Sequence, residues 1–192
     1  MRSVTIGFMI ALVMLCNGGE AVGHGNSAQT DSIKTAPAQL TDELAPLAFL
    51  IGTWEGIGSG SPGSSAGEFS FESRVQGHVL VRHNTSDSQS GRHEDVMLLY
   101  AAPRVGLRAI YVDNEDHVIN YAVSLSEEPK GAVFLSDEVS GMPRFRLSYR
   151  VKPDGTAGIV FEMAPPGTTE FKVYLEGTGR KRPVSKPAHS IE

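Results

Sequence analysis

Apolar and polar side chains alternate in short segments along most of the chain, and turn residues separate these segments. Residues 144–151 show the pattern most clearly. Phe145, Leu147 and Tyr149 fall on one face of this segment, and charged or hydroxyl side chains fall on the other. A period of two with one polar face is typical of a β-strand between a core and water. Residues 170–178 alternate in the same way.

This pattern predicts ten short strands joined by turns rich in Gly, Pro, Asn, Asp and Ser. No segment has the apolar periodicity of a long helix. The sequence therefore predicts an all-β protein, a closed antiparallel up-and-down barrel of about ten strands. The expected strands comprise residues 53–60, 67–75, 79–85, 93–101, 107–113, 117–125, 132–137, 144–151, 158–163 and 170–178.

A short N-terminal helix is expected just before the first strand. Thr41 supplies a hydroxyl cap, and Asp42 and Glu43 follow in the first turn, where the helix dipole favours acids. Pro46 keeps this helix short. The lipocalin-like barrel domain, with this helix, is expected to comprise residues 41–181.

The two ends of the chain have compositions unlike the barrel. Residues 1–23 have the pattern of a secretory signal peptide, with Arg2 before an apolar run and small residues up to Ala21. The apolar run, about 12 residues, is too short to span a bilayer. We therefore expect export to the periplasm or the extracellular space, without membrane insertion after signal removal. Residues 24–40 are expected to be a flexible leader and residues 182–192 a disordered tail.

Cysteine content and charge narrow the chemistry. The only cysteine, Cys16, lies in the segment expected to be removed, so the mature chain offers no disulfide, cysteine nucleophile or cysteine-ligated metal. Leu15 precedes it, where a lipid anchor needs a small residue. The net charge of -5, without a basic run, argues against nucleic acid and anionic membranes as partners.

A Gly-x-Trp motif opens the first expected strand. The sequence Gly-Thr-Trp-Glu-Gly-Ile-Gly over residues 52–58 contains the only tryptophan, Trp54. This motif, after a short helical turn, resembles the signature of the lipocalin and fatty-acid-binding (calycin) superfamily. It is also similar to the opening of nitrobindin-type haem-binding barrels and of uncharacterised exported bacterial lipocalin-like proteins. The resemblance implies a barrel closed at one end by Trp54, stacked beneath an arginine of the last strand, for which Arg180 is the candidate.

The resemblance to nitrobindin-type barrels implies haem only if a histidine near the last strand can bind the iron. Residues 171–176 read Phe-Lys-Val-Tyr-Leu-Glu and contain none. Tyr174 is a conceivable replacement ligand, but alternation puts it on the face opposite Phe171 and Val173. The sequence therefore argues against haem, and the peroxynitrite chemistry of that family is not expected.

Strand pairing predicts polar side chains inside the barrel. A turn centred on Ser88 places His83 directly opposite His93, and Asp95 shares the face of His93. The same pairing puts Arg82 and Glu94 on the outer face as an exposed ion pair.

Two further hairpins extend this inner face. The turn at Pro103 brings Arg108 onto it, and the turn at Asn114 and Glu115 brings Tyr121 onto it. In residues 117–125 most of the side chains on the same face as Tyr121 are apolar, so we expect this face to point inward. A single β-bulge would reverse every assignment beyond it.

The expected inner cluster allows three interpretations. It is a hydrogen-bonded group at the open rim, a set of groups that orients a ligand, or a metal site in which two histidines and a carboxylate leave coordination positions open. In the second interpretation Arg108 meets a carboxylate of the ligand. The cluster comprises His83, His93, Asp95, Arg108 and Tyr121.

The sequence favours non-covalent binding of a small, largely apolar molecule, acidic if Arg108 contacts it. No cofactor is required for this function. The sequence has no P-loop, His-Glu-x-x-His or Gly-x-Ser-x-Gly motif. The alternatives are a metal- or haem-dependent enzyme in the same cavity, which a bound metal would favour, and an interaction scaffold, which a cavity filled by its own side chains would favour.

Overall fold

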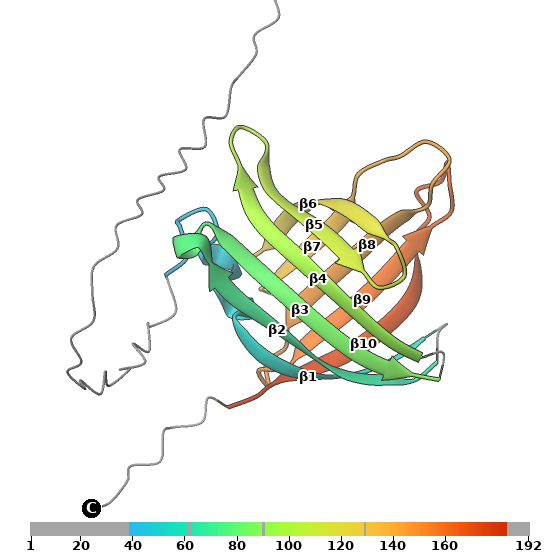
Figure 1. Ribbon diagram of the computed structural model, residues 1–192, viewed down its shortest axis with the longest axis horizontal. Coiled ribbons are helices and arrows are strands. Elements are labelled where there is room, and N and C mark those ends of the chain that lie inside the picture. Colours follow the sequence, from blue (N-terminus) through green and yellow to red (C-terminus); the bar gives the residue numbers. More distant parts are fainter. Residues whose placement is uncertain (1–38, 61–62, 90, 129, 184–192) are drawn as a thin grey trace, which may run out of the picture. The chain divides into compact units, whose positions relative to one another are not determined.

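The structure is a computed structural model that describes residues 39–60, 63–89, 91–128 and 130–183. Its ten strands form one closed antiparallel barrel (Figure 1). Each strand pairs with the next along the chain, and β1 pairs with β10 to close the barrel. The all-β, up-and-down prediction is confirmed. The strands are β1 (Gly52–Gly60), β2 (Ser65–Arg74), β3 (Val79–Ser88), β4 (Gly91–Ala102), β5 (Gly106–Asp113), β6 (Val118–Ser126), β7 (Gly131–Ser136), β8 (Arg144–Val151), β9 (Ala157–Ala164) and β10 (Lys172–Lys181).

The expected N-terminal helix is wrong in type. The chain forms turns at residues 42–44 and then a short 3-10 helix, η1 (Ala45–Leu50). A proline at the start of η1 and a length of only 6 residues explain why no α-helix propagates. The predicted signal peptide, most of the leader and most of the tail lie outside the described residues. No helix among the described residues is long and apolar enough to cross a membrane.

The Gly-x-Trp motif joins η1 to the barrel. Gly52 has a φ of 120°, which side-chain-bearing residues rarely adopt, and this lets the chain turn sharply from η1 into β1. Two residues later Trp54 is buried, and its Nε1 donates a hydrogen bond to the Leu50 carbonyl at 2.8 Å. The motif therefore fixes η1 across one end of the barrel.

Apolar side chains fill the end of the barrel beneath η1. Leu44, Leu47 and Leu50 are fully buried there. Phe71 and Tyr149 pack edge to face, with ring centres 5.7 Å apart, and Phe134 lies 5.9 Å from the same tyrosine. Side chains of opposite walls thus meet in the middle of the barrel at this end.

The last strand departs from simple alternation. The register between β10 and β9 shifts between Val173 and Leu175, which is a β-bulge. As a result Val173 is 53% exposed although the sequence pattern groups it with Leu175, which lines the interior. Simple alternation therefore predicts the wrong orientation for Val173, because an inserted residue reverses the orientation of the residues beyond it.

Candidate functional site

The half of the barrel opposite η1 contains a cavity of about 380 Å³. Its wall along β8, β9 and β10 is mainly apolar, and Phe145 and Phe161 stack there with ring centres 5.8 Å apart. Its wall along β3, β4, β5 and the start of β6 carries charged and hydrogen-bonding side chains. The apolar wall is formed by Phe145, Leu147, Ile159, Phe161, Met163 and Leu175.

Glycines of β1, β2 and β10 widen the cavity between these two walls. Gly56, Gly58, Gly67 and Gly177 line it without side chains. A Cβ atom added at Gly56 would lie 3.7 Å from its nearest neighbour, a ring carbon of Phe69. A larger residue at Gly56 would therefore extend into the cavity without a backbone clash.

A buried ion pair forms the polar floor of the cavity. Arg82 Nη1 donates to Asp95 Oδ1, and Asn84 Nδ2 donates to Asp95 Oδ2 at 2.8 Å. The Arg82 guanidinium also lies 5.9 Å from the ring centre of Phe69. Burial acts to lower the pKa of Arg82, but the neighbouring Tyr149 and Asp95 raise it further than burial lowers it. Arg82 therefore stays positively charged, and its partner carboxylate is held in place.

His93 joins this floor to the rim. Its Nε2 lies 3.2 Å from Asp95 Oδ2, and its Nδ1 lies 3.2 Å from Glu115 Oε1. The hydrogen bond with Asp95 raises the pKa of His93 to about 9, partial burial opposes the rise, and Glu115 adds to it. At neutral pH the imidazole is therefore protonated and donates to both carboxylates.

The turn after β5 presents a second carboxylate at the rim. Backbone amides of Glu115 and His117 donate to Asp113 Oδ1 at 2.9 and 3.0 Å. Tyr111 donates to Asp113 Oδ2 at 3.0 Å, and His117 Nδ1 lies 2.9 Å from the same oxygen. Burial acts to raise the pKa of Asp113, but the hydrogen bonds from His117, Glu115 and Tyr111 lower it overall. Asp113 is therefore a fixed, ionised group.

Five side chains were expected inside the barrel, and three of them line the cavity: His93, Asp95 and Tyr121. Tyr121 is 1% exposed and packs edge to face on Phe134, and burial raises its pKa. That these three residues contact a ligand remains a prediction.

The expected inward orientation of His83 is wrong. Ser88 pairs with Gly91, so His83 lies opposite Val96 and points outward, while Arg82 lies opposite Met97 and points inward. The expected turn centred on Ser88 has the wrong register, and an odd shift in register exchanges the two faces of a strand. The expected outer ion pair of Arg82 with Glu94 is therefore also wrong.

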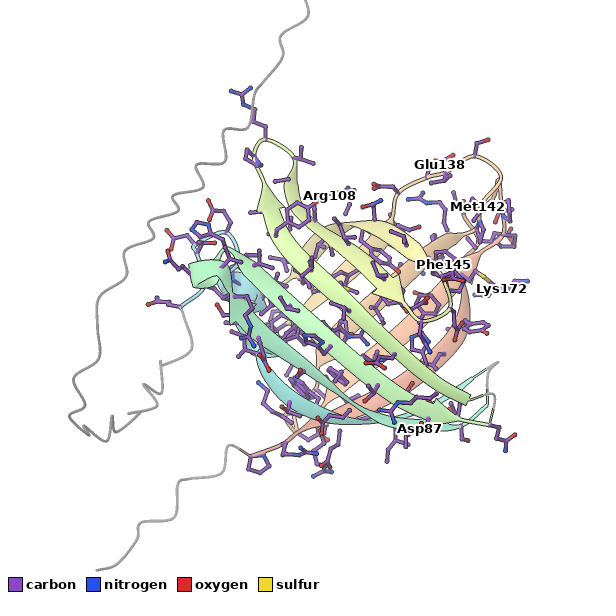
Figure 2. All side chains as sticks on the ribbon, in the orientation of Figure 1. Asp87, Arg108, Glu138, Met142, Phe145 and Lys172 are labelled. Atoms are coloured by element: carbon purple, nitrogen blue, oxygen red, sulfur yellow. The ribbon has the colours of Figure 1, made fainter. Side chains whose placement is uncertain are left out.

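The expected inward orientation of Arg108 is wrong for the same reason. Arg108 pairs with Tyr100 and Ala122 on the outer face, where Nη2 donates to Asp137. Figure 2 marks Arg108 well away from Phe145, which belongs to the cavity wall. The next hairpin is also displaced by one residue, so the two errors cancel and Tyr121 faces inward as expected.

The expected stacking of Arg180 on Trp54 is wrong, and Lys181 takes that position. Lys181 Nζ lies 4.7 Å from the centre of the Trp54 ring and donates to the Phe49 carbonyl at 3.2 Å. Arg180 pairs with Glu55 and is exposed. The cation that the resemblance implies beside Trp54 is thus present, but it belongs to Lys181, one residue further along the strand.

Several residues of the polar wall were not expected from the sequence. One local signal for β3 was present, because Asn84, Ser86 and Ser88 are small polar residues at alternate positions, as the wall of a cavity mouth requires. Asp113 and Glu115, at and after the end of β5, carried no sequence signal beyond that of turn residues. The missed residues are Arg82, Asn84, Tyr111, Asp113, Glu115 and His117.

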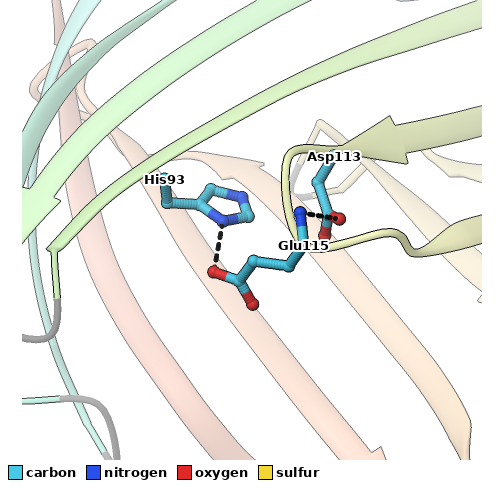
Figure 3. A group of neighbouring side chains, drawn as sticks. All are labelled: His93, Asp113 and Glu115. Carbon is cyan, nitrogen blue, oxygen red and sulfur yellow. Dashed lines mark hydrogen bonds and ion pairs between the residues drawn. The ribbon is translucent and has the colours of Figure 1, made fainter.

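Among the residues that the structure describes, His93, Asp113 and Glu115 form a group that could hold a metal ion (Figure 3). They come from β4, from the end of β5 and from the turn that follows. Tyr174, the conceivable replacement for a haem-ligating histidine, lines the cavity at the β10 bulge. β10 itself carries no histidine.

Comparisons with known proteins show similarity of fold. The chain resembles the crystal structure of Rv2717c from M. tuberculosis, with 16% identity, a TM-score of 0.56, and coverage of 76% of this chain and 100% of that one. A second similar structure is a de novo designed fluorescence-activating β-barrel, with 12% identity, a TM-score of 0.40, and coverage of 70% of this chain and 94% of the design. No family model matches the sequence, and no curated protein matches it. The likeness to Rv2717c supports the closed-barrel fold.

Proposed function

We propose that this protein binds a small amphipathic molecule non-covalently in the barrel cavity. The observation that carries the proposal is a cavity of about 380 Å³ with one apolar wall and one wall of fixed polar groups. Small-molecule sites have this composition, because apolar contact supplies affinity and a few placed polar groups supply orientation. The open volume also favours binding over the scaffold alternative, in which side chains would fill the barrel.

The polar wall suggests which end group the ligand carries. Arg82 and His93 supply two positive charges. Asp95, Asp113 and Glu115 supply three carboxylates to the same cavity. The expectation of an acidic ligand depended on Arg108, which lies on the outer face. We therefore propose a ligand with a neutral hydrogen-bonding or cationic end group and an apolar body against Phe145 and Phe161.

Filling the cavity tests this function. Gly56→Leu should place a side chain beside Phe69 and exclude the ligand, whereas Ala122→Leu adds the same bulk on the exposed outer face. Binding is measured with N-phenyl-1-naphthylamine, a small neutral dye that fluoresces in apolar surroundings. We expect the wild type and Ala122→Leu to bind it equally, and Gly56→Leu to bind at least about tenfold more weakly, equivalent to about 1.4 kcal/mol. Equal binding by all three proteins would place the dye outside the cavity.

We also propose that the protein is exported, on the pattern of charge, apolar run and small residues in residues 1–23. Native mass spectrometry of protein recovered from its own host tests both proposals together. A mass that lacks this segment supports export. An additional organic mass, lost in Gly56→Leu, identifies the ligand, and an empty wild-type protein would contradict the binding function.

A further inference from the structure

The rim of the cavity brings an imidazole and two carboxylates together. His93, Asp113 and Glu115 each offer one ligand atom, and these atoms all lie within 4.8 Å of one another. Figure 3 shows the ring of His93 and the carboxylate of Glu115 directed toward each other, with His93 Nδ1 and Glu115 Oε1 3.2 Å apart. One nitrogen and two carboxylate oxygens are a ligand set that divalent transition metals accept, and three protein ligands leave further positions open.

A buried carboxylate outside this group orients the histidine. Asp95 is 4% exposed and lies behind the ring, 3.2 Å from Nε2. Arg82 and Asn84 hold Asp95 in turn. In metal sites the ligating histidine almost always gives its second N–H to such a carboxylate, which fixes the ring and makes the other nitrogen a better ligand. In this protein that arrangement leaves Nδ1, the nitrogen that faces Glu115, to bind the cation, which displaces the proton that Nδ1 donates to Glu115.

Asp113 is also held in advance. Two backbone amides occupy its Oδ1, and Tyr111 and His117 contact its Oδ2. Because Asp113 is fixed by its own turn and His93 by the floor of the cavity, only two exposed side chains have to move. Glu115, which is 58% exposed, closes around the cation, and His117, which is 54% exposed, turns away from Asp113 Oδ2 to leave a lone pair for the metal. Little conformational entropy is then lost on binding.

We propose that His93 Nδ1, Asp113 and Glu115 bind one divalent transition-metal cation, of the Zn²⁺ or Co²⁺ type, at the mouth of the cavity. Two carboxylates balance the charge of the cation, and the imidazole favours these metals over Mg²⁺ and Ca²⁺, which prefer oxygen ligands alone. The open coordination positions face solvent or the cavity. This site goes beyond the proposed function, because it needs no organic ligand.

Titration of tag-free, chelator-treated protein with Zn²⁺ in a calorimeter tests the proposal. Co²⁺ replaces Zn²⁺ in a parallel absorption measurement that reports its ligands. We expect one Zn²⁺ per chain, and binding at least about tenfold weaker in Glu115→Gln and in His93→Gln. Glu94→Gln is the matched control, because this neighbouring carboxylate is exposed and lies outside the group, and it should bind as the wild type does.

Glu115→Gln keeps the result interpretable, because its side chain lies on an exposed turn and its loss should leave the fold intact. No measurable Zn²⁺ binding by the wild type would overturn the proposal. So would equal binding by the wild type and Glu115→Gln, which would place the metal elsewhere. When the dye assay is run on the same chelator-treated protein, loss of Zn²⁺ binding and loss of cavity binding are separate results.

Discussion

At the scale of single residues, the buried Arg82–Asp95 pair supports the polar floor of the cavity. Both side chains are buried, at 8% and 4% exposure, and both are charged. A buried charge is tolerated when its partner and its hydrogen bonds remain in place. Arg82 Nε has no hydrogen-bond partner among the described residues, so the guanidinium depends on Asp95 for its compensation. The pair thus fixes the position of His93 and adds a stability requirement.

Removing one charge of this pair should be costly. Asp95→Asn leaves the Arg82 guanidinium buried without a counter-charge, and we expect the free energy of unfolding to fall by about 3–5 kcal/mol. Urea unfolding, followed by the fluorescence of Trp54, measures this loss. Asp87→Asn, on the same strand pair but exposed, should change stability by less than about 0.5 kcal/mol. A similar small loss in Asp95→Asn would show that the pair is not required for stability.

At the scale of the strands, turns can be recognised from local sequence, whereas the orientation of side chains toward the inside or the outside cannot. Glycine, proline and polar clusters mark each turn in the sequence, so all ten strands could be predicted with boundaries close to those observed. Which side chains face inward depends on the exact pairing across each turn, and a shift of one residue exchanges the two faces. For this reason the expected orientations of His83 and Arg108 were wrong. His93 and Asp95 were placed inside correctly, and Tyr121 was placed inside only because two register errors cancelled.

The β10 bulge and the Asp113–His117 turn lie beyond sequence reasoning for a different reason. A bulge leaves no compositional signal in Lys172–Lys181, and its effect appears only in the pairing with β9. The hydrogen bonds that fix Asp113 come largely from backbone amides, which every sequence possesses. The group proposed to bind a metal at the rim therefore becomes visible only when β4 and the turn after β5 are placed side by side.

Cysteine labelling tests the register of the two hairpins. In a Cys16→Ser background, His83→Cys should react with N-ethylmaleimide as an exposed thiol, because His83 faces outward. Ala109→Cys should be protected in the native state, because Ala109 is 1% exposed. Mass spectrometry measures both rates, and labelling in urea, where the two thiols should react equally, is the control. The opposite order of reactivity would restore the register that the sequence suggests.

At the scale of the whole molecule, the barrel divides into an end that stabilises the fold and an end that holds the cavity. Beneath η1, fully buried apolar residues and aromatic rings pack across the whole width of the barrel. At the other end, glycines and polar residues leave the cavity open. A barrel core needs only enough apolar contact to offset chain entropy, so one half can supply stability while the other retains a cavity and buried charges.

This division predicts that one phenylalanine substitution mainly lowers stability and another mainly weakens binding. Phe71 is fully buried in the packed half, so Phe71→Ala should cost about 3–5 kcal/mol of unfolding free energy. Phe161 already faces the cavity, so Phe161→Ala should cost only about 1–2 kcal/mol. Phe161→Ala should nevertheless weaken the binding of N-phenyl-1-naphthylamine by about tenfold, because the dye loses its contact with one ring of the apolar wall.

Urea unfolding and dye titration of the same two variants separate these effects. Phe71→Ala should retain the affinity of the wild type wherever it is folded, because its ring lies outside the cavity lining. Phe161→Ala should unfold at a midpoint between those of the wild type and Phe71→Ala, and it should bind poorly. If both variants lost stability and affinity in the same proportion, binding would depend on the integrity of the whole barrel rather than on contacts at its open end.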